Sequence, residues 1–148
     1  MAAKTAGLLY RLVRLLFRTA IHAYYREFSV AGRERIPAHG PLLIIANHNN
    51  SIMDALTISV VSPRPIHFLA KDTLFAPGAK QILTSLGVIP IYRKQDDPGK
   101  LGKNRQVFAA AHAVLRENGV IGIFPEGLSH AEPRLKELKS GFARIALE

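Results

Sequence analysis

The sequence predicts an α/β fold, in which helices flank a mostly parallel sheet and an amphipathic helix precedes the domain. Beyond Gly32, short continuous apolar runs alternate with helix-like stretches. Strands that form uninterrupted apolar runs are typical of parallel sheets buried on both faces. The chain has 148 residues, of which 48% are hydrophobic, and this is enough for one domain with its own core.

Residues 8–25 predict the amphipathic helix. Apolar residues recur along it every three or four positions, and three arginines recur on the opposite side: Arg11, Arg14 and Arg18. Such a basic amphipathic helix is typical of a segment that lies in a membrane interface and attracts anionic lipids. The alternative is that its apolar face packs on the domain.

The N-terminal segment does not have the pattern of a membrane span or a signal peptide. Its arginines interrupt every apolar run well short of the roughly 18 residues that a transmembrane helix needs. They also interrupt the apolar region that a signal peptide requires. We therefore expect residues 1–31 to form a membrane-interface helix and residues 32–148 to form the folded domain.

The remaining elements follow from the apolar pattern. The expected strands are residues 42–46, 66–70, 87–92 and 120–124, and the expected helices are at about 51–61, 75–86 and 103–118. The last helix stops at Gly119, a C-terminal cap signal, and residues 93–103 form a polar loop. No further strand appears after Phe124, so we expect a domain that is incomplete at its C-terminus.

Composition narrows the classes of partner. There are 20 Lys and Arg residues against 11 Asp and Glu residues, for a net charge of +9, which favours anionic partners. The absence of cysteine excludes disulfides, zinc-thiolate sites and a thiol nucleophile. No recognition-helix motif or basic strand with interleaved aromatic residues appears, so we expect no nucleic-acid partner.

Polar residues follow three of the four expected strands. Parallel strands end at one edge of a sheet, where ligands bind, so these residues should converge. His48 follows the first strand, and Asp54 lies in the first turn of the next helix. An Asp–His pair leaves one ring nitrogen free to act as a base toward a hydroxyl. Alternatively, Ser51 and Asp54 form a capping box that only stabilises the helix.

Two other strand ends carry candidate binding groups. Arg93 follows the run 87–92, and its planar guanidinium suits a phosphate, although a charge that opens a polar loop can equally be solvated. Glu126 and Gly127 follow the run 120–124 in a Pro-Glu-Gly turn. Glu126 could accept hydrogen bonds from substrate hydroxyls, or the segment could be an ordinary surface turn.

The chain resembles the glycerolipid acyltransferases, the family of lysophosphatidic acid and glycerol-3-phosphate acyltransferases. Residues 47–54 (NHNNSIMD) resemble their first motif, residues 87–93 (GVIPIYR) the second and residues 124–129 (FPEGLS) the third. Residues 68–75 (FLAKDTLF) resemble the segment that often precedes the second motif. The resemblance covers about residues 32–148, an acyltransferase domain.

The resemblance implies a reaction. His48 would be the general base and Asp54 its partner. The acceptor hydroxyl would attack an acyl thioester of coenzyme A or acyl carrier protein. The product would enter phospholipid biosynthesis at the cytoplasmic face of a membrane.

The resemblance also assigns the binding residues. Arg93 would hold the acceptor's phosphate, Lys71 is a further phosphate candidate, and Glu126 and Gly127 would shape the glycerol pocket. No metal or redox cofactor is implied.

The chain departs from the family pattern at three places. Five residues separate His48 from Asp54, where four are commoner; this favours the branch with glycerol-3-phosphate and dihydroxyacetone-phosphate acyltransferases. A lysophospholipid acceptor stays open. Leu128-Ser129-His130 replaces the usual Thr-Arg-Ser, so His130, Arg134 or Lys139 would replace the missing arginine. The fourth motif is absent because the chain ends first. The alternative function is therefore a truncated, inactive domain that only binds anionic membranes.

Overall fold

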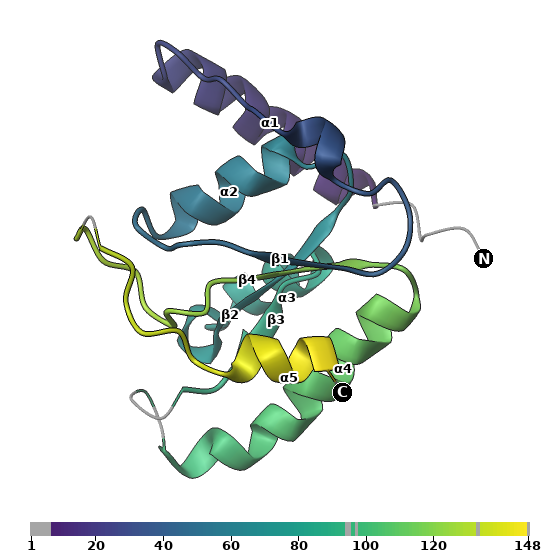
Figure 1. Cartoon of the computed structure of the whole chain (residues 1–148), viewed down its shortest axis with the longest axis vertical. Helices are drawn as coiled ribbons and strands as arrows, with labels where there is room; N and C mark the ends of the chain where they lie inside the picture. The colour runs from purple at the N-terminus through teal and green to yellow at the C-terminus, as the bar shows by residue number, and fades with distance from the viewer. Residues whose placement is uncertain (1–6, 94–95, 97, 133, 148) are drawn as a thin grey trace.

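The computed structural model describes residues 7–93, 96, 98–132 and 134–147. Within that part of the chain, four parallel strands form one sheet in the order β1-β4-β2-β3 (Figure 1). The strands are β1 (Leu42–Ile45), β2 (Ile66–Lys71), β3 (Ile89–Ile91) and β4 (Val120–Ile123). The predicted α/β class and parallel sheet are confirmed, and each strand overlaps one of the expected apolar runs.

Strand β4 lies between β1 and β2 and aligns them. Val120 pairs with Leu42 of β1 and with Ile66 of β2, so the three strands begin at the same level. All four residues of β4 are buried. Because the pairing is parallel, the loops that follow these strands leave from one edge of the sheet.

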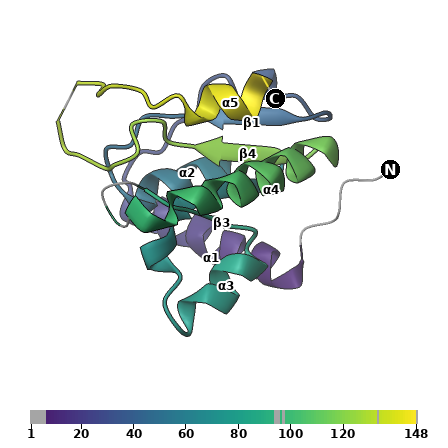
Figure 2. The same ribbon diagram turned by 90° about the horizontal axis from the view of Figure 1, so that it is seen from below.

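Helices cover both faces of the sheet (Figures 1 and 2). On one face lie α2 (Ile52–Val61) and, outside it, α1 (Leu8–Tyr24); on the other lie α4 (Asn104–Arg116) and α5 (Gly141–Leu147). The remaining helix, α3 (Ala79–Ser85), connects β2 to β3. Short 3₁₀ turns occur at Arg33–Arg35, Asp72–Leu74 and Pro98–Lys103.

The sheet separates two apolar clusters. On the α2 side, the buried members are Ile66, Phe68 and Val120. On the α4 and α5 side, they are Leu69, Val107, Ala111, Ile121, Ile123 and Ile145. Neighbouring positions of β2 and β4 serve opposite clusters, as the two-residue period of a strand requires. Full burial of one such side chain stabilises the fold by about 1.5–3 kcal/mol.

The end of α4 differs in detail from the sequence prediction. Asn118, and not Gly119, takes the left-handed conformation, with φ 60°. The N–H of Gly119 donates to the carbonyl of Val114 at 2.8 Å. A Cβ at Gly119 would lie 2.7 Å from that carbonyl oxygen, so the close approach of the two backbones requires glycine there.

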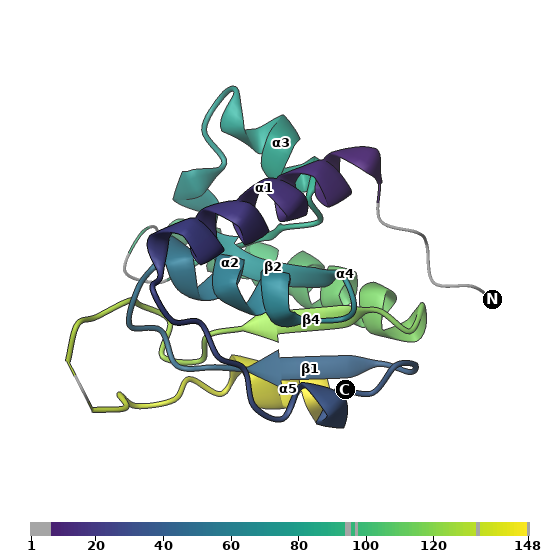
Figure 3. The ribbon, with the colours of Figure 1, turned by 90° about the horizontal axis from the view of Figure 1, so that it is seen from above.

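Helix α1 packs along the outside of α2 (Figure 3). Ile21 is 2% exposed, and the guanidinium of Arg14 donates to the carbonyls of Val60, at 3.2 Å, and Ser62, at the end of α2. Arg14 therefore caps a neighbouring helix, in contrast to the expectation that it lies on the polar face with Arg11 and Arg18.

The opposite side of α1 exposes a leucine patch. Its members are between 45% and 73% exposed: Leu8, Leu9, Leu12, Leu15 and Leu16. The helix thus packs on the domain through one side and presents apolar surface on the other. Among the described residues, no helix combines the length and apolar character that crossing a membrane requires.

Candidate active site

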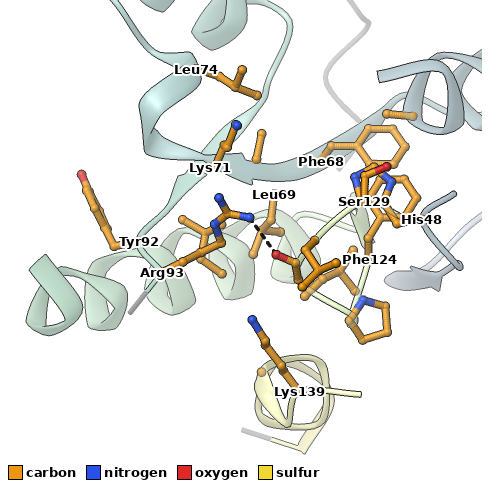
Figure 4. Close-up of a pocket in the computed structure, with 18 of the residues that line it drawn as sticks. His48, Phe68, Leu69, Lys71, Leu74, Tyr92, Arg93, Phe124, Ser129 and Lys139 are labelled. Carbon is orange, nitrogen blue, oxygen red and sulfur yellow. Dashed lines mark hydrogen bonds between the residues drawn. The ribbon is translucent and has the colours of Figure 1, made fainter. Parts of the chain in front are cut away.

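A cavity of about 670 Å³ lies where the loops leave the carboxyl ends of the strands (Figure 4). Its lining includes one residue from beyond each of three strands, His48, Arg93 and Gly127, and Lys71, the last residue of β2. The parallel topology thus brings these four sequence-predicted residues to one cavity. Glu126, the neighbour of Gly127, does not line it.

His48 and Asp54 are in contact. Nδ1–H of His48 donates to Oδ2 of Asp54 at 3.0 Å, and the same oxygen accepts the N–H of Asn50 at 2.8 Å. The two side chains are 20% and 17% exposed. Ser51 makes no side-chain capping bond, so the capping box does not form. Because Nδ1 is engaged and His48 lines the cavity, Nε2 is the nitrogen left for a substrate.

An aromatic stack fixes the plane of the histidine ring. The rings of His48 and Phe124 stack with centroids 4.1 Å apart and planes 14° apart. Phe124 in turn stacks on Phe68 with centroids 5.7 Å apart. Phe124 ends an expected strand and begins the third motif, but its stacking on His48 depends on the pairing of β1 with β4, which the sequence does not show.

Glu126 is buried, with 2% of its surface exposed. Its Oε1 accepts the peptide N–H of His48 at 2.9 Å, and its Oε2 accepts the N–H of Lys136 at 3.1 Å and Nε2–H of His130. The bond from His130, followed by that from Lys136, lowers the pKa of Glu126 from 4.5 to about 2 against the effect of burial. Glu126 therefore braces the His48 loop, and its burial excludes the alternative of an ordinary surface turn, while its contact with substrate stays a prediction.

The loops after β1 and β4 are bonded to each other at further points. The N–H of His130 donates to the carbonyl of His48 at 3.1 Å, and the N–H of Ser51 donates to Oγ of Ser129 at 2.9 Å. Ser51 has φ 52°, a conformation that non-glycine residues rarely adopt. Surrounding contacts must hold such a residue, and the bond to Ser129 is one of them.

Arg93 is held in place by two neighbours. Its Nε and Nη2 donate to the carboxylate of Asp96 at 2.5 and 2.8 Å, and its Nη1 donates to the carbonyl of Gly127 at 2.8 Å (Figure 4). The bond from Arg93 lowers the pKa of Asp96. The guanidinium thus lines the cavity with much of its charge already matched by a carboxylate.

Two lysines add positive charge around Arg93, which lies between the labelled Lys71 and Lys139 in Figure 4. Gly127 has φ 69°, and a Cβ there would lie 2.6 Å from Nζ of Lys139. Of the three residues expected to replace the missing arginine, Lys139 lines the cavity, whereas Arg134 and His130 do not. No group of three His, Asp or Glu side chains that could hold a metal ion occurs among the residues the structure describes.

Comparison with known proteins identifies the family. The family model described as Acyltransferase matches residues 27–148. The chain belongs to this acyltransferase family. The match begins after α1 and includes every cavity residue named above.

The acyltransferase chain also matches curated relatives. It is 30% identical over 120 residues to a protein of Borreliella burgdorferi named 1-acyl-sn-glycerol-3-phosphate acyltransferase, covering 80% of this chain and 46% of the relative. It is 24% identical over 139 residues to the mouse (Mus musculus) 1-acyl-sn-glycerol-3-phosphate acyltransferase alpha, covering 93% and 47%. The chain thus spans about half the length of these relatives. The resemblance to glycerolipid acyltransferases is confirmed. No solved structure matches the chain at a significant level.

Proposed function

We propose that the chain transfers a fatty acyl group from acyl-CoA or acyl carrier protein to a hydroxyl of a glycerol phosphate, in phospholipid biosynthesis. The acceptor is glycerol-3-phosphate or 1-acylglycerol-3-phosphate. The observation that carries the proposal is the contact between His48 and Asp54 beside a cavity lined by basic side chains. Family membership and the names of the two relatives support the same class of reaction.

His48 acts as the base in the proposed mechanism. Its Nε2 accepts the proton of the acceptor hydroxyl as that oxygen attacks the thioester carbonyl carbon. The carbon–sulfur bond then breaks, and the thiolate takes the proton from the imidazolium. Asp54 stabilises the imidazolium through Nδ1, and the stack on Phe124 keeps the ring plane fixed. The reaction needs no metal or redox cofactor.

The acceptor's phosphate binds among Arg93, Lys71 and Lys139. Asp96 already engages two of the N–H groups of Arg93, so the lysines supply the uncompensated part of the positive charge. The cavity is also lined by apolar side chains from both faces of the sheet, including Phe68, Leu69 and Phe108. This apolar side suits the acyl chain, because burial of each methylene contributes about 0.8 kcal/mol.

The test offers labelled acyl-CoA and acyl-ACP with each acceptor in turn: glycerol-3-phosphate, dihydroxyacetone phosphate, 1-acylglycerol-3-phosphate, a lysophospholipid without a free phosphate monoester, and glycerol. Acyl transfer that requires the phosphate monoester supports the proposal. A folded chain that binds vesicles and acylates none of these acceptors favours the alternative, a domain that only binds membranes.

Membrane association is the second part of the proposal, with the cytoplasmic face as the site. The leucine patch of α1 enters the interface, and Arg11 and Arg18, on the solvent-exposed flank, meet anionic headgroups. Arg14 is not part of this contact because it binds the end of α2. The helix would hold the cavity near the bilayer that supplies or receives the acyl chain.

A further inference from the structure

His130 occupies an enclosed position beside the candidate base. Its side chain is 6% exposed, and it is absent from the lining of the cavity. It therefore touches no substrate in the cavity. Its Nε2 contacts Oε2 of Glu126, whose side chain is fully enclosed. A carboxylate only accepts hydrogen bonds, so Nε2 carries the proton and donates.

The contact continues to the backbone of His48. Glu126 uses its other oxygen, Oε1, to accept the N–H of His48 at 2.9 Å. The backbone N–H of His130 donates to the carbonyl of His48 at 3.1 Å. Both polar backbone groups of His48 are therefore held by the segment 126–130: the carbonyl by the backbone of His130, and the N–H by the Glu126 carboxylate that the His130 side chain contacts.

We propose that His130 is a positioning residue for the base: its Nε2–H holds the Glu126 carboxylate on the peptide N–H of His48 and so fixes where the His48 ring lies. This inference rests on the proposed function only where activity is measured. The imidazole ring of His48 must meet the acceptor hydroxyl within hydrogen-bond reach, and a displacement of about 1 Å can lower the rate about 100-fold.

Glu126 needs this donor because it is buried. Without His130, Oε2 keeps the N–H of Lys136 alone, and the buried carboxylate loses one of its three hydrogen bonds. A buried charge with fewer partners moves toward water, which releases the His48 peptide N–H, or takes up a proton, which weakens that hydrogen bond. His130 thus acts on the reaction through Glu126.

Two amide variants distinguish the loss of the hydrogen-bond donor from the loss of the ring's bulk. In His130→Gln the side-chain N–H lies near the place of Nε2, whereas in His130→Asn it lies near the place of Nδ1 and does not reach Glu126. Nδ1 of His130 is buried without a hydrogen-bond partner among the described residues, so His130→Gln loses no hydrogen bond at that position. His130→Ala removes the donor altogether.

Steady-state acyl transfer is measured for the unchanged chain and the three variants. His130→Ala and His130→Asn are expected to lower kcat about 10- to 100-fold with the KM of both substrates little changed. His130→Gln is expected to keep most of kcat. Equal kcat in all four proteins, a loss confined to KM, or failure of Gln to exceed Asn overturns the inference.

An NMR measurement of the His48 amide proton tests the inference without depending on activity. In the unchanged chain and in His130→Gln, the amide proton of His48 should resonate downfield, as expected for a donor to a carboxylate, and exchange slowly with solvent. In His130→Ala and His130→Asn it should move upfield and exchange faster. An unmoved His48 amide in folded His130→Ala overturns the inference. If the unchanged chain acylates nothing, the proposed function fails, while this measurement still decides the role of His130.

Discussion

Nδ1 of His48 lies 3.0 Å from Oδ2 of Asp54, and that oxygen also accepts the N–H of Asn50. One carboxylate oxygen thus orients the ring and closes the turn that carries it. The first prediction is that Asp54→Asn lowers kcat by about 10- to 100-fold, part of the 10²–10⁴ that general base catalysis supplies. The amide can still accept both bonds but carries no charge to stabilise the imidazolium.

Ser51→Ala is the matched control, because the side chain of Ser51 makes no capping bond to α2. Steady-state kinetics and a melting curve are measured for both variants. Ser51→Ala should keep kcat. If Asp54→Asn keeps kcat and loses only stability, Asp54 is a structural residue and not the partner of the base.

Binding of the acceptor's phosphate is predicted to depend on Arg93. Arg93→Ala should raise the KM of the acceptor about 10- to 100-fold, since a hydrogen bond to a charged group contributes about 1.5–3 kcal/mol. The KM of the acyl donor should change less. Because Asp96 competes for the same guanidinium, Asp96→Asn should lower the acceptor's KM. An effect of Arg93→Ala on the donor alone would mean that the phosphate binds elsewhere.

The hydrogen bonds that Glu126 accepts from His130 and Lys136 predict a specific acid sensitivity. Its pKa is about 2 in the folded chain and 4.5 in the unfolded chain, so its contribution to stability is present above pH 4.5 and is lost as the pH falls toward 2. Unfolding free energy measured by denaturant titration should therefore fall more steeply in this window for the unchanged chain than for Glu126→Gln. The lowered pKa values of Asp96 and Glu132 persist in both proteins and cancel in the comparison. Parallel curves would exclude Glu126 as a stabilising carboxylate.

Two kinds of residue on α1, arginines and leucines, are predicted to contribute differently to membrane binding. Changing Arg11 and Arg18 to Gln should weaken binding to anionic vesicles by about 1 kcal/mol per arginine and change binding to neutral vesicles little. Changing Leu12 and Leu16 to Gln should weaken binding to both, because it removes apolar surface.

Arg14→Gln is the control within the same helix. It should lower the melting temperature, since Arg14 binds the end of α2, and leave vesicle binding nearly unchanged. Sedimentation with vesicles of varied composition measures the binding. Binding that ignores both lipid charge and the leucine changes would assign α1 a purely structural role.

The fold class could be predicted because its signal is local. Buried parallel strands are continuous apolar runs, and all four expected runs contain the observed strands or nearly so. The strand order could not be predicted in this way, because β4 pairs with strands that lie about 55 to 80 positions earlier in the chain. Gly119 was expected to cap α4, but Asn118 adopts the left-handed conformation. The backbone of Gly119 instead lies against Val114, a contact that the sequence did not indicate.

Within the site, the spacing predicted that His48 and Asp54 can meet, because one turn and the start of a helix bring them together, with a capping box as the alternative that the structure excludes. The burial of Glu126 could not be predicted. Its role depends on His48, on His130 and on the backbone of Lys136, which meet only after the loops fold against each other. The stack of His48 on Phe124 and the hydrogen bonds of Arg14 to the end of α2 could not be predicted for the same reason.

In the proposed mechanism, Nε2 of His48 takes the proton of the acceptor hydroxyl. The most direct test of this step is kcat of acyl transfer by His48→Ala, at saturating donor and acceptor, beside the unchanged chain. We expect a kcat at least about 100-fold lower, in a variant that remains folded by its melting curve. A folded His48→Ala that transfers acyl groups at nearly the unchanged rate would contradict it.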